Sequence, residues 1–389
     1  MSKNNKIKIA IVFGTRPELI KIYPIITEAR KYQNWIDLIL ISTAQHREML
    51  DQIASLFQVV PDYDLDIMKH NQTISQINSQ TLLKLERIYK ETKPDIVLVQ
   101  GDTTTTFSGA LAAFYQKINI GHIEAGLRTT KKYYPFPEEI NRRLTTVLTD
   151  YHFAPTENAK KLLLKEGIDK NNIYVTGNTV IDTLFLMQKK DITFSDHKIN
   201  NIILNKNQRI LLVTMHRREN WGKPLEDLCR SLLCINEKYD NVKIIFPVHK
   251  NPLIKAVVNK YLSGKKDIVL SDPLDYSEMA NLIKYSTLIL TDSGGIQEEA
   301  PALGKPVLIL RNETERIEVI EKGFAKLIGT EPDKIINNVE NLLSNDIEYK
   351  KMSCNKRSPY GDGKAANRII EFILFKYNYI SEKPDEFII

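Results

Sequence analysis

Three glutamates and three arginines lie in one segment, GHIEAGLRTTKKYYPFPEEINRRL, residues 121–144. Glu124 directly follows a run of apolar residues, and Glu138 and Glu139 follow a Pro-Phe-Pro turn. Carboxylates gathered in one place can act as general acids and bases, and neighbouring arginines can offset their charge. The segment therefore indicates a site of proton transfer. The alternative is that Glu124 is an exposed loop residue paired with Arg128.

Two further polar residues follow apolar runs elsewhere in the chain. Asp102 stands in Gly-Asp-Thr-Thr-Thr-Thr, where the threonines can cap the next helix and Asp102 is not needed for it. His216 follows the run 209–214 and is flanked by two arginines and a glutamate. Histidine is well suited to moving protons near neutral pH, although a lone histidine at a strand end is more often structural. His249, in PVHKNP, is a weaker example of the same arrangement.

A third segment, TDSGGIQEEA at 291–300, has the composition of a phosphate-binding turn. A helix that starts after Ser-Gly-Gly offers backbone N–H groups and its positive dipole end to an anion. Glu299 lies further along the helix, where its carboxylate could bind ribose hydroxyls. A simple helix cap also explains Ser-Gly-Gly, but it explains the following Gln-Glu-Glu less readily. The expected phosphate cradle consists of Ser293, Gly294 and Gly295.

Basic residues stand where they could meet the same anion. Arg16 opens a helical pattern in Gly-Thr-Arg-Pro-Glu, and Lys21 follows about one helical turn later. Cations at a helix N-terminus oppose the helix dipole unless an anion is bound there. Arg316 follows the apolar run 307–310 and could reach the same ligand. A plain strand-to-helix turn with an exposed Arg16 is the alternative.

The elements that must position these residues form two successive series of strands and helices. The apolar runs are continuous and do not alternate with polar residues, which is typical of parallel sheets covered on both faces. We therefore predict an α/β protein with two Rossmann-like, doubly wound domains facing a cleft, where ligands meet the carboxyl ends of the strands. The predicted strands are 7–13, 36–42, 96–99, 119–123, 151–154 and 173–176 in the first series, and 209–214, 242–247, 268–270, 288–290 and 307–310 in the second.

The expected domains are residues 1–185, with the catalytic carboxylates, and 186–364, with the nucleotide site. The segment 189–207 is rich in Lys, Asn and Asp and has little periodicity, so we interpret it as a linker. The final segment, 365–389, begins with an amphipathic helical pattern. We expect this helix to pack back on the N-terminal domain.

The composition is that of an ordinary globular protein with no nucleic-acid or membrane partner. The net charge is +6, and the 54 Lys and Arg residues are spread along the chain instead of forming a patch. Cys229, Cys234 and Cys354 form no Cys-x-x-Cys pair, which favours buried thiols in a reducing compartment. No apolar run reaches the roughly 20 residues that cross a bilayer, and the N-terminal run is too short for a signal peptide. We therefore expect a cytoplasmic protein.

Taken in order, the motifs resemble one family, the non-hydrolysing UDP-N-acetylglucosamine 2-epimerases. They extend over nearly the whole chain, and several are long. The resemblance implies a glycosyltransferase-B-like architecture, in agreement with the two series above. The segments that carry it are VFGTRPE at 12–18, TAQHREMLDQ at 43–52, GDTTTT at 101–106, GHIEAGLRT at 121–129, PFPEEINR at 135–142, TGNTVIDTL at 176–184, HRREN at 216–220, TDSGGIQEEAPALGKPVL at 291–308 and PYGDG at 359–363.

The resemblance implies a reversible reaction that inverts C2 of UDP-GlcNAc and gives UDP-ManNAc. Members are thought to eliminate UDP, which leaves 2-acetamidoglucal, and then to add UDP back after protonation of the opposite face. The resemblance also implies that neither nicotinamide nor metal is needed, that the enzyme is a homodimer, and that it supplies ManNAc units for cell-surface polysaccharides. Walker-type and His- or Cys-cluster motifs are absent from the sequence, in keeping with this expectation.

The family's site residues can be carried over to matching positions. The four catalytic positions fall on Asp102, Glu124, Glu138 and His216. Glu139 is set aside, because the match falls on Glu138. Positions that the resemblance assigns to the substrate and UDP are Arg16, Lys21, Arg142, Ser293, Gly294, Gly295, Glu299 and Arg316. Several bacterial members also bind a second UDP-GlcNAc as an activator, and this region matches Gln45, His46 and His249.

The sequence departs from the family pattern at several places. Leu19, Ile22 and Tyr23 replace the usual small or short residues after Arg-Pro-Glu, and Ile317 replaces a proline. These changes put the sugar in doubt more than the chemistry, so an epimerase of a related UDP-N-acetyl sugar stays open. Three further classes stay open as well: a hydrolysing epimerase, which releases free ManNAc, a glycosyltransferase of the same fold, and an inactive UDP-sugar-binding regulator.

Overall fold

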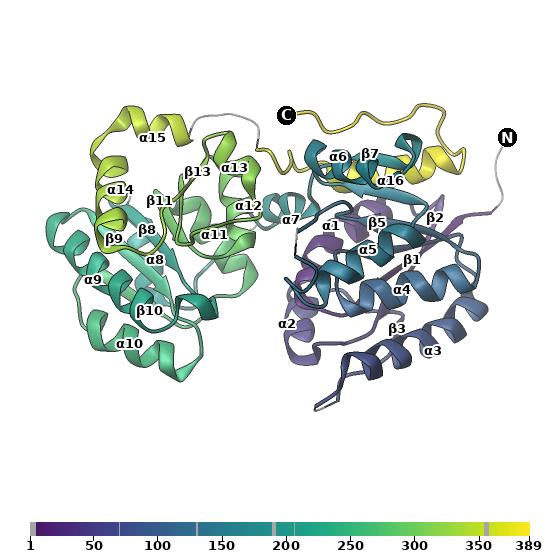
Figure 1. The fold of residues 1–389 in the computed structure, drawn as a ribbon, viewed down its shortest axis with the longest axis horizontal. Helices are drawn as coiled ribbons and strands as arrows, with labels where there is room; N and C mark the ends of the chain where they lie inside the picture. The colour runs from purple at the N-terminus through teal and green to yellow at the C-terminus, as the bar shows by residue number, and fades with distance from the viewer. Residues whose placement is uncertain (1–4, 70, 130, 189–191, 206, 354–357) are drawn as a thin grey trace. The chain divides into compact units, whose positions relative to one another are not determined.

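The computed structural model describes residues 5–69, 71–129, 131–188, 192–205, 207–353 and 358–389. The chain divides into two compact units (Figure 1). The first unit comprises Met1–Thr183 and Tyr360–Ile389, and the second comprises Leu184–Pro359. The chain therefore passes between the units after Thr183, inside helix α7 (Thr179–Gln188), and again after Pro359.

The first unit is built on a seven-stranded sheet in the order β3-β2-β1-β4-β5-β6-β7. All of its strand pairs are parallel, which places the carboxyl ends of the strands along one edge. The order reverses between β1 and β4, the position where open α/β sheets bind ligands. The strands are β1 (Ile7–Phe13), β2 (Ile36–Ser42), β3 (Tyr63–Asp64), β4 (Ile96–Gln100), β5 (Asn119–Ile123), β6 (Tyr151–Ala154) and β7 (Ile173–Val175).

Helices cover this sheet and include one from the end of the chain. α16 packs against α1 (Figure 1). Its Phe372 ring stacks on Tyr174 of β7 and meets Phe153 of β6 edge-on. The backbone N–H of Phe387 then donates to Val175 O at 2.8 Å. The C-terminal segment is thus held to the first sheet by packing and hydrogen bonding. The helices are α1 (Arg16–Lys31), α2 (Arg47–Phe57), α3 (Ile74–Thr92), α4 (Thr104–Tyr115), α5 (Glu138–Leu148), α6 (Glu157–Lys165), the 3-10 turn η1 (Lys170–Asn172) and α16 (Ala365–Lys376).

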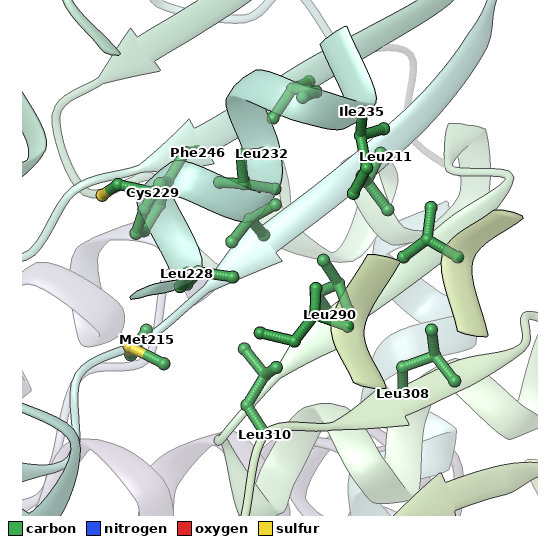
Figure 2. Packing of buried hydrophobic residues seen from close by; sticks show 14 of the residues in the cluster. Leu211, Met215, Leu228, Cys229, Leu232, Ile235, Phe246, Leu290, Leu308 and Leu310 are labelled. Atoms are coloured by element: carbon green, nitrogen blue, oxygen red, sulfur yellow. The ribbon is translucent and has the colours of Figure 1, made fainter. Parts of the chain in front are cut away.

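The second unit repeats the plan with a six-stranded parallel sheet in the order β10-β9-β8-β11-β12-β13. Its core is apolar: Figure 2 shows Leu228 and Leu232 of α9 beside Leu211 and Phe246 of the sheet. Burial of these side chains provides the main driving force for this unit to fold. The strands are β8 (Arg209–Thr214), β9 (Val242–Pro247), β10 (Ile268–Ser271), β11 (Leu288–Thr291), β12 (Val307–Ile309) and β13 (Ala325–Leu327).

The helices of the second unit begin with the C-terminal half of α7. The other helices are α8 (His197–Leu204), the 3-10 turn η2 (Arg218–Asn220), α9 (Lys223–Lys238), α10 (Pro252–Leu262), α11 (Tyr276–Tyr285), α12 (Gly294–Ala302), α13 (Ile317–Glu321), α14 (Pro332–Ser344) and α15 (Asp346–Ser353). Within the described parts of the chain, none of the helices combines the length and apolar character needed to cross a membrane.

The predicted α/β class with two parallel sheets is confirmed, and three local predictions are corrected. The interpretation of 189–207 as the linker is wrong, because the chain passes between the units after Thr183 and α8 forms within this segment, with Asp196 as its cap. The strands β3 and β13 were not predicted, since runs of two and three residues carry too little periodicity. Cys229 is buried as expected, Cys234 is exposed, and Cys354 lies outside the described residues.

Candidate active site

The turn after β1 leaves no room for a side chain at Gly14 unless its neighbours shift. A Cβ added to Gly14 would lie 2.0 Å from Thr43 Oγ1 and 2.5 Å from Thr105 Oγ1. The chain therefore turns in contact with the neighbouring strand-end loops and enters α1 at Arg16. Arg16 is partly exposed, and within the described residues its guanidinium forms no hydrogen bond or ion pair.

A buried carboxylate joins this turn to the turn that carries Asp102. Glu18 is 1% exposed, and it accepts hydrogen bonds from Gly14 N at 3.0 Å and Thr103 Oγ1 at 2.7 Å. Thr103 is also the cap of α4 and receives Thr106 N at 3.1 Å. Burial raises the pKa of Glu18, and these hydrogen bonds oppose the rise. No role was predicted for Glu18; its only sequence signal is its place in Gly-Thr-Arg-Pro-Glu.

Asp102 is held by helix α5. Its carboxylate forms an ion pair with Arg142, and its backbone carbonyl accepts a hydrogen bond from Asn141 Nδ2 at 3.0 Å. Arg142 also lies 3.5 Å from Glu139 Oε2. The structure thus brings Asp102 and Arg142 together, two residues that the sequence singled out separately.

Glu124 occupies a strained backbone position at the end of β5. Its φ of 66° lies in the left-handed region, which residues with a side chain adopt rarely. The carboxylate is ion-paired with Lys21 of α1. It also accepts hydrogen bonds from Gln100 Nε2 at 3.2 Å and Asn178 Nδ2 at 3.3 Å. Three elements therefore fix the direction of this side chain.

The arginines of segment 121–144 pair with carboxylates other than Glu124, so the alternative in which Glu124 is paired with Arg128 is wrong. Arg128 donates to both carboxylate oxygens of Glu166, at 2.8 and 2.7 Å. Glu139, 1% exposed, accepts hydrogen bonds from Thr129 N at 3.0 Å and Arg143 Nε at 2.7 Å. These contacts stabilise the path of the segment.

Glu138 differs from its neighbour Glu139 in exposure and in hydrogen bonding. It is the first residue of α5 and is partly exposed. Among the residues that the structure describes, its carboxylate forms no hydrogen bond or ion pair. Of the two adjacent glutamates, Glu138 is thus the one whose carboxylate is available to a ligand.

In the second unit, His216 lies after β8 and faces Asp292, which lies after β11. Asp292 is fully buried, and it accepts hydrogen bonds from His216 N at 3.0 Å and Arg217 N at 2.9 Å. His216 Nδ1 lies 3.3 Å from Asp292 Oδ1, and the His216 side chain is about half exposed. Partial burial, Arg217 and His249 lower the pKa of His216, and the charge of Asp292 opposes them. Asp292 was not predicted as a site residue.

The Ser-Gly-Gly turn begins α12, as the phosphate-cradle prediction requires. Ser293 is the cap residue, and its own hydroxyl makes no capping hydrogen bond. A Cβ on Gly294 would lie 3.3 Å from the guanidinium carbon of Arg316, whereas one on Gly295 would meet no atom closer than 3.9 Å. Arg316 is oriented by Glu298, which accepts its Nε at 2.9 Å. The N-terminus of α12, which is the positive end of the helix dipole, thus lies beside the Arg316 guanidinium. This arrangement is suited to binding a phosphate.

Glu299 lies about one and a half turns into α12 and is buried. Tyr276, the first residue of α11, donates its hydroxyl to Glu299 Oε1 at 2.7 Å. This hydrogen bond fixes one carboxylate oxygen of the residue expected on the ribose. Tyr276 was not predicted, since a tyrosine at a helix start carries no signal of its own.

A cavity of about 360 Å³ in the second unit is lined by Asn220 and Arg311, among others. Asn220 Nδ2 also donates to Asp292 Oδ2 at 3.0 Å. Arg311 is buried and donates to Glu315 at 2.8 Å. Burial raises the pKa of Glu315, but Arg316 and Arg311 outweigh it and lower that pKa to about 2.

The three residues expected at an activator site lie on both units. Gln45 is tied to α4, because its Oε1 accepts Thr105 Oγ1 at 2.9 Å. His46 is exposed immediately before α2. His249, in the second unit, is exposed, and its Nδ1 accepts Asn251 N at 3.1 Å. Their common site stays a prediction.

Comparison with known proteins gives consistent matches along the chain. The family model described as UDP-N-acetylglucosamine 2-epimerase matches residues 28–374. The curated UDP-N-acetylglucosamine 2-epimerase of Bacillus subtilis is 48% identical over 383 residues, which cover 98% of this chain and 99% of that protein. This similarity was predicted from the motifs.

Solved structures agree. The UDP-GlcNAc 2-epimerase of Neisseria meningitidis, solved bound to UDP-GlcNAc, is 46% identical and has a TM-score of 0.83, covering 95% of this chain and 100% of that chain. MurG of Acinetobacter baumannii is 13% identical with a TM-score of 0.59, covering 95% and 99% of the two chains. The latter likeness concerns the fold alone and supports the predicted glycosyltransferase-B-like architecture of two Rossmann-like domains.

Proposed function

The chain belongs to the UDP-N-acetylglucosamine 2-epimerase family, and from this premise we propose that it interconverts UDP-GlcNAc and UDP-ManNAc without releasing free sugar. The enzyme is an isomerase that inverts one carbon, C2. Removal of the C2 proton and cleavage of the C1–O bond to UDP leave a C1=C2 double bond in 2-acetamidoglucal. Protonation of C2 from the opposite face and return of UDP to C1 complete the inversion. No net oxidation occurs.

Proton transfer on two faces of C2 requires more than one acid–base group, and the first unit provides Asp102, Glu124 and Glu138. The observation that carries the proposal is the orientation of Glu124. Its backbone is strained, and Lys21, Gln100 and Asn178 all contact its carboxylate. A side chain aimed by so many contacts is preorganised for one task.

The second unit provides groups that suit a departing diphosphate. The backbone N–H groups of Gly294 and Gly295 and the Arg316 guanidinium can bear its negative charge, and Glu299 can accept hydrogen bonds from the ribose. His216 would donate to the diphosphate or move a proton. We assign Arg16 and Arg142 of the first unit to the substrate as well. The structure of the Neisseria relative bound to UDP-GlcNAc supports our proposal that this chain binds the same nucleotide sugar.

We also propose a homodimer that acts in the cytoplasm and supplies ManNAc units for cell-surface polysaccharides. Large apolar side chains are exposed on α3, α4 and α5, and α4 packs against both other helices. Such a surface is typical of a protein–protein interface. The side chains are Leu83, Phe114, Tyr115, Leu144 and Val147. Val147→Asp should convert the dimer to a monomer in sedimentation experiments; an unchanged mass would argue against this surface.

An activator site for a second UDP-GlcNAc at Gln45, His46 and His249 is part of the proposal. Initial rates with UDP-ManNAc alone should then show a lag or a sigmoidal curve that traces of UDP-GlcNAc remove. A hyperbolic curve that does not respond to UDP-GlcNAc would count against activation.

Product analysis tests the proposed function. Incubation with UDP-GlcNAc should give an equilibrium mixture with UDP-ManNAc, whereas free ManNAc and UDP would identify a hydrolysing epimerase. Activity only after an acceptor sugar is added would identify a glycosyltransferase. Asp102→Asn, Glu124→Gln, Glu138→Gln and His216→Asn should each reduce turnover by about 10²–10⁴-fold. Near-normal turnover in all four would show that the site assignment is wrong.

A further inference from the structure

Asp292 is surrounded by N–H donors from the segment that carries His216. It accepts from the backbone of His216 and Arg217 and from the side chain of Asn220, at 3.0, 2.9 and 3.0 Å. Its exposure is 0%. A buried carboxylate with these donors cannot turn away, so its oxygens have fixed positions. The His216 ring also lies beside this carboxylate, with Nδ1 3.3 Å from Oδ1.

We propose that Asp292 is the positioning residue of His216: it keeps the ring proton on Nδ1 and leaves Nε2 as the nitrogen that meets the ligand. The opposite tautomer would bring the Nδ1 lone pair against a carboxylate oxygen, which costs electrostatic energy. A distance of 3.3 Å is longer than an ideal hydrogen bond, and such contacts commonly shorten when a ligand binds.

Three further histidines of the described chain provide a contrast. His249 Nδ1 accepts Asn251 N at 3.1 Å, so its proton belongs on Nε2. His122 Nε2 faces Gly101 O at 2.7 Å and His152 Nε2 faces Thr146 O at 3.1 Å, and a carbonyl requires a donor from each ring. These three histidines are thus Nε2–H tautomers in the neutral form, whereas His216 is the Nδ1–H tautomer.

This assignment defines what His216 can do, a step that rests on the proposed function. When C1–O breaks, the electron pair stays on the β-phosphate oxygen of UDP, and an imidazolium can donate its Nε2 proton to that oxygen. The ring then keeps its proton on Nδ1, beside Asp292. When UDP returns to C1, Nε2 takes the proton back. The charged groups that act on the ring are Asp292, Arg217 and His249.

Nitrogen NMR of the whole protein, labelled with ¹⁵N-histidine, tests the tautomer without substrate. Long-range ¹H–¹⁵N spectra at about pH 8 should show Nδ1–H for His216 and Nε2–H for His122, His152 and His249, with the resonance assigned by its loss in His216→Asn. An Nε2–H pattern for His216 in the unmodified protein would overturn the proposal. The tautomer is thus measured on the unmodified protein, and the variant serves only to identify the His216 resonance.

Asp292→Asn tests the positioning role. The His216 spectrum should change to Nε2–H, and kcat/KM should fall by about 10³-fold. The dependence of kcat/KM on pH should also differ in shape from that of the unmodified protein. Asp196→Asn is a matched control, because Asp196 only caps α8; it should leave both unchanged. An unaltered spectrum or pH profile in folded Asp292→Asn would refute positioning. The expected spectra in a protein that does not epimerise UDP-GlcNAc would refute only the proposed reaction.

Discussion

The ammonium group of Lys21 is ion-paired with the carboxylate of Glu124, so helix α1 places its cation against the acid at the end of β5. The family resemblance assigned Lys21 to the diphosphate and Glu124 to proton transfer. If Lys21 left Glu124 to bind the diphosphate, as the proposed function requires, the charge around the Glu124 carboxylate would change, so the ion pair would couple the two proposed tasks. Both side chains are largely buried, so solvent screens their attraction only weakly.

Replacement of Lys21 by Met should therefore affect catalysis more than folding. The variant removes the only cation paired with Glu124 among the described residues, and we expect a loss of kcat of about 10²-fold. Lys31→Met, at the exposed end of the same helix, should have wild-type kinetics. Steady-state kinetics of both variants, with melting curves, make the comparison. Equal activities would contradict a role for the ion pair.

The adjacent residues Glu138 and Glu139 should respond in opposite ways to the same substitution. Glu139→Gln disturbs hydrogen bonds to Thr129 and Arg143 in a buried place, so unfolding should require about 1–3 kcal/mol less. Glu138→Gln disturbs no such contact and should keep its stability while losing turnover. Urea unfolding and single-turnover rates distinguish the two. The reverse pattern would show that the family match has been placed on the wrong glutamate.

Gly14→Ala and Gly295→Ala should separate packing from ligand binding. The alanine at 14 collides with Thr43 and Thr105 and should cost about 1–3 kcal/mol of stability. The alanine at 295 has space for its methyl group, and the helix gains from losing a glycine, so stability should be kept or raised. UDP binding, measured by calorimetry, should nevertheless weaken. Unchanged UDP affinity in Gly295→Ala would mean that the cradle lies elsewhere.

His122 should make the protein sensitive to acid. Burial lowers the pKa of His122 to about 3, whereas the unfolded chain binds a proton near 6.5. As pH falls, the unfolded state is therefore protonated first, so the stabilising contribution is complete above about pH 6.5 and is lost progressively towards pH 3. The difference in unfolding free energy between wild type and His122→Gln should shrink from about pH 7.5 to about pH 5. A difference that does not change with pH would contradict this explanation. Burial also lowers the pKa of His152, but His152 is present in both proteins, so its contribution cancels in the difference.

The places of three candidate site residues along the chain could be predicted, because each of the three follows an apolar strand. Asp102 and Glu124 come two residues and one residue after β4 and β5 of the first sheet, and His216 comes two residues after β8 of the second sheet. Within each parallel sheet, the carboxyl ends of the strands share one edge. The amphipathic segment at α16 likewise has a readable helical period. These features are local, and local patterns survive in a single sequence.

The partners of those acids could not be predicted. The Lys21–Glu124 pair depends on where α1 crosses the sheet, and Arg128 pairs instead with Glu166. Asp292 looked like part of a helix turn, because its partner His216 lies 76 residues earlier in the chain. Such pairings depend on strand order and burial, which no short motif reports.

The central claim is that the protein removes and returns a proton at C2 while UDP is detached. Incubation of the purified enzyme with UDP-GlcNAc in D₂O, followed by NMR of the sugar, tests it most directly. We expect an equilibrium mixture of UDP-GlcNAc and UDP-ManNAc in which both epimers carry deuterium at C2. A mixture of epimers that keeps protium at C2, or no UDP-ManNAc at all, would contradict it.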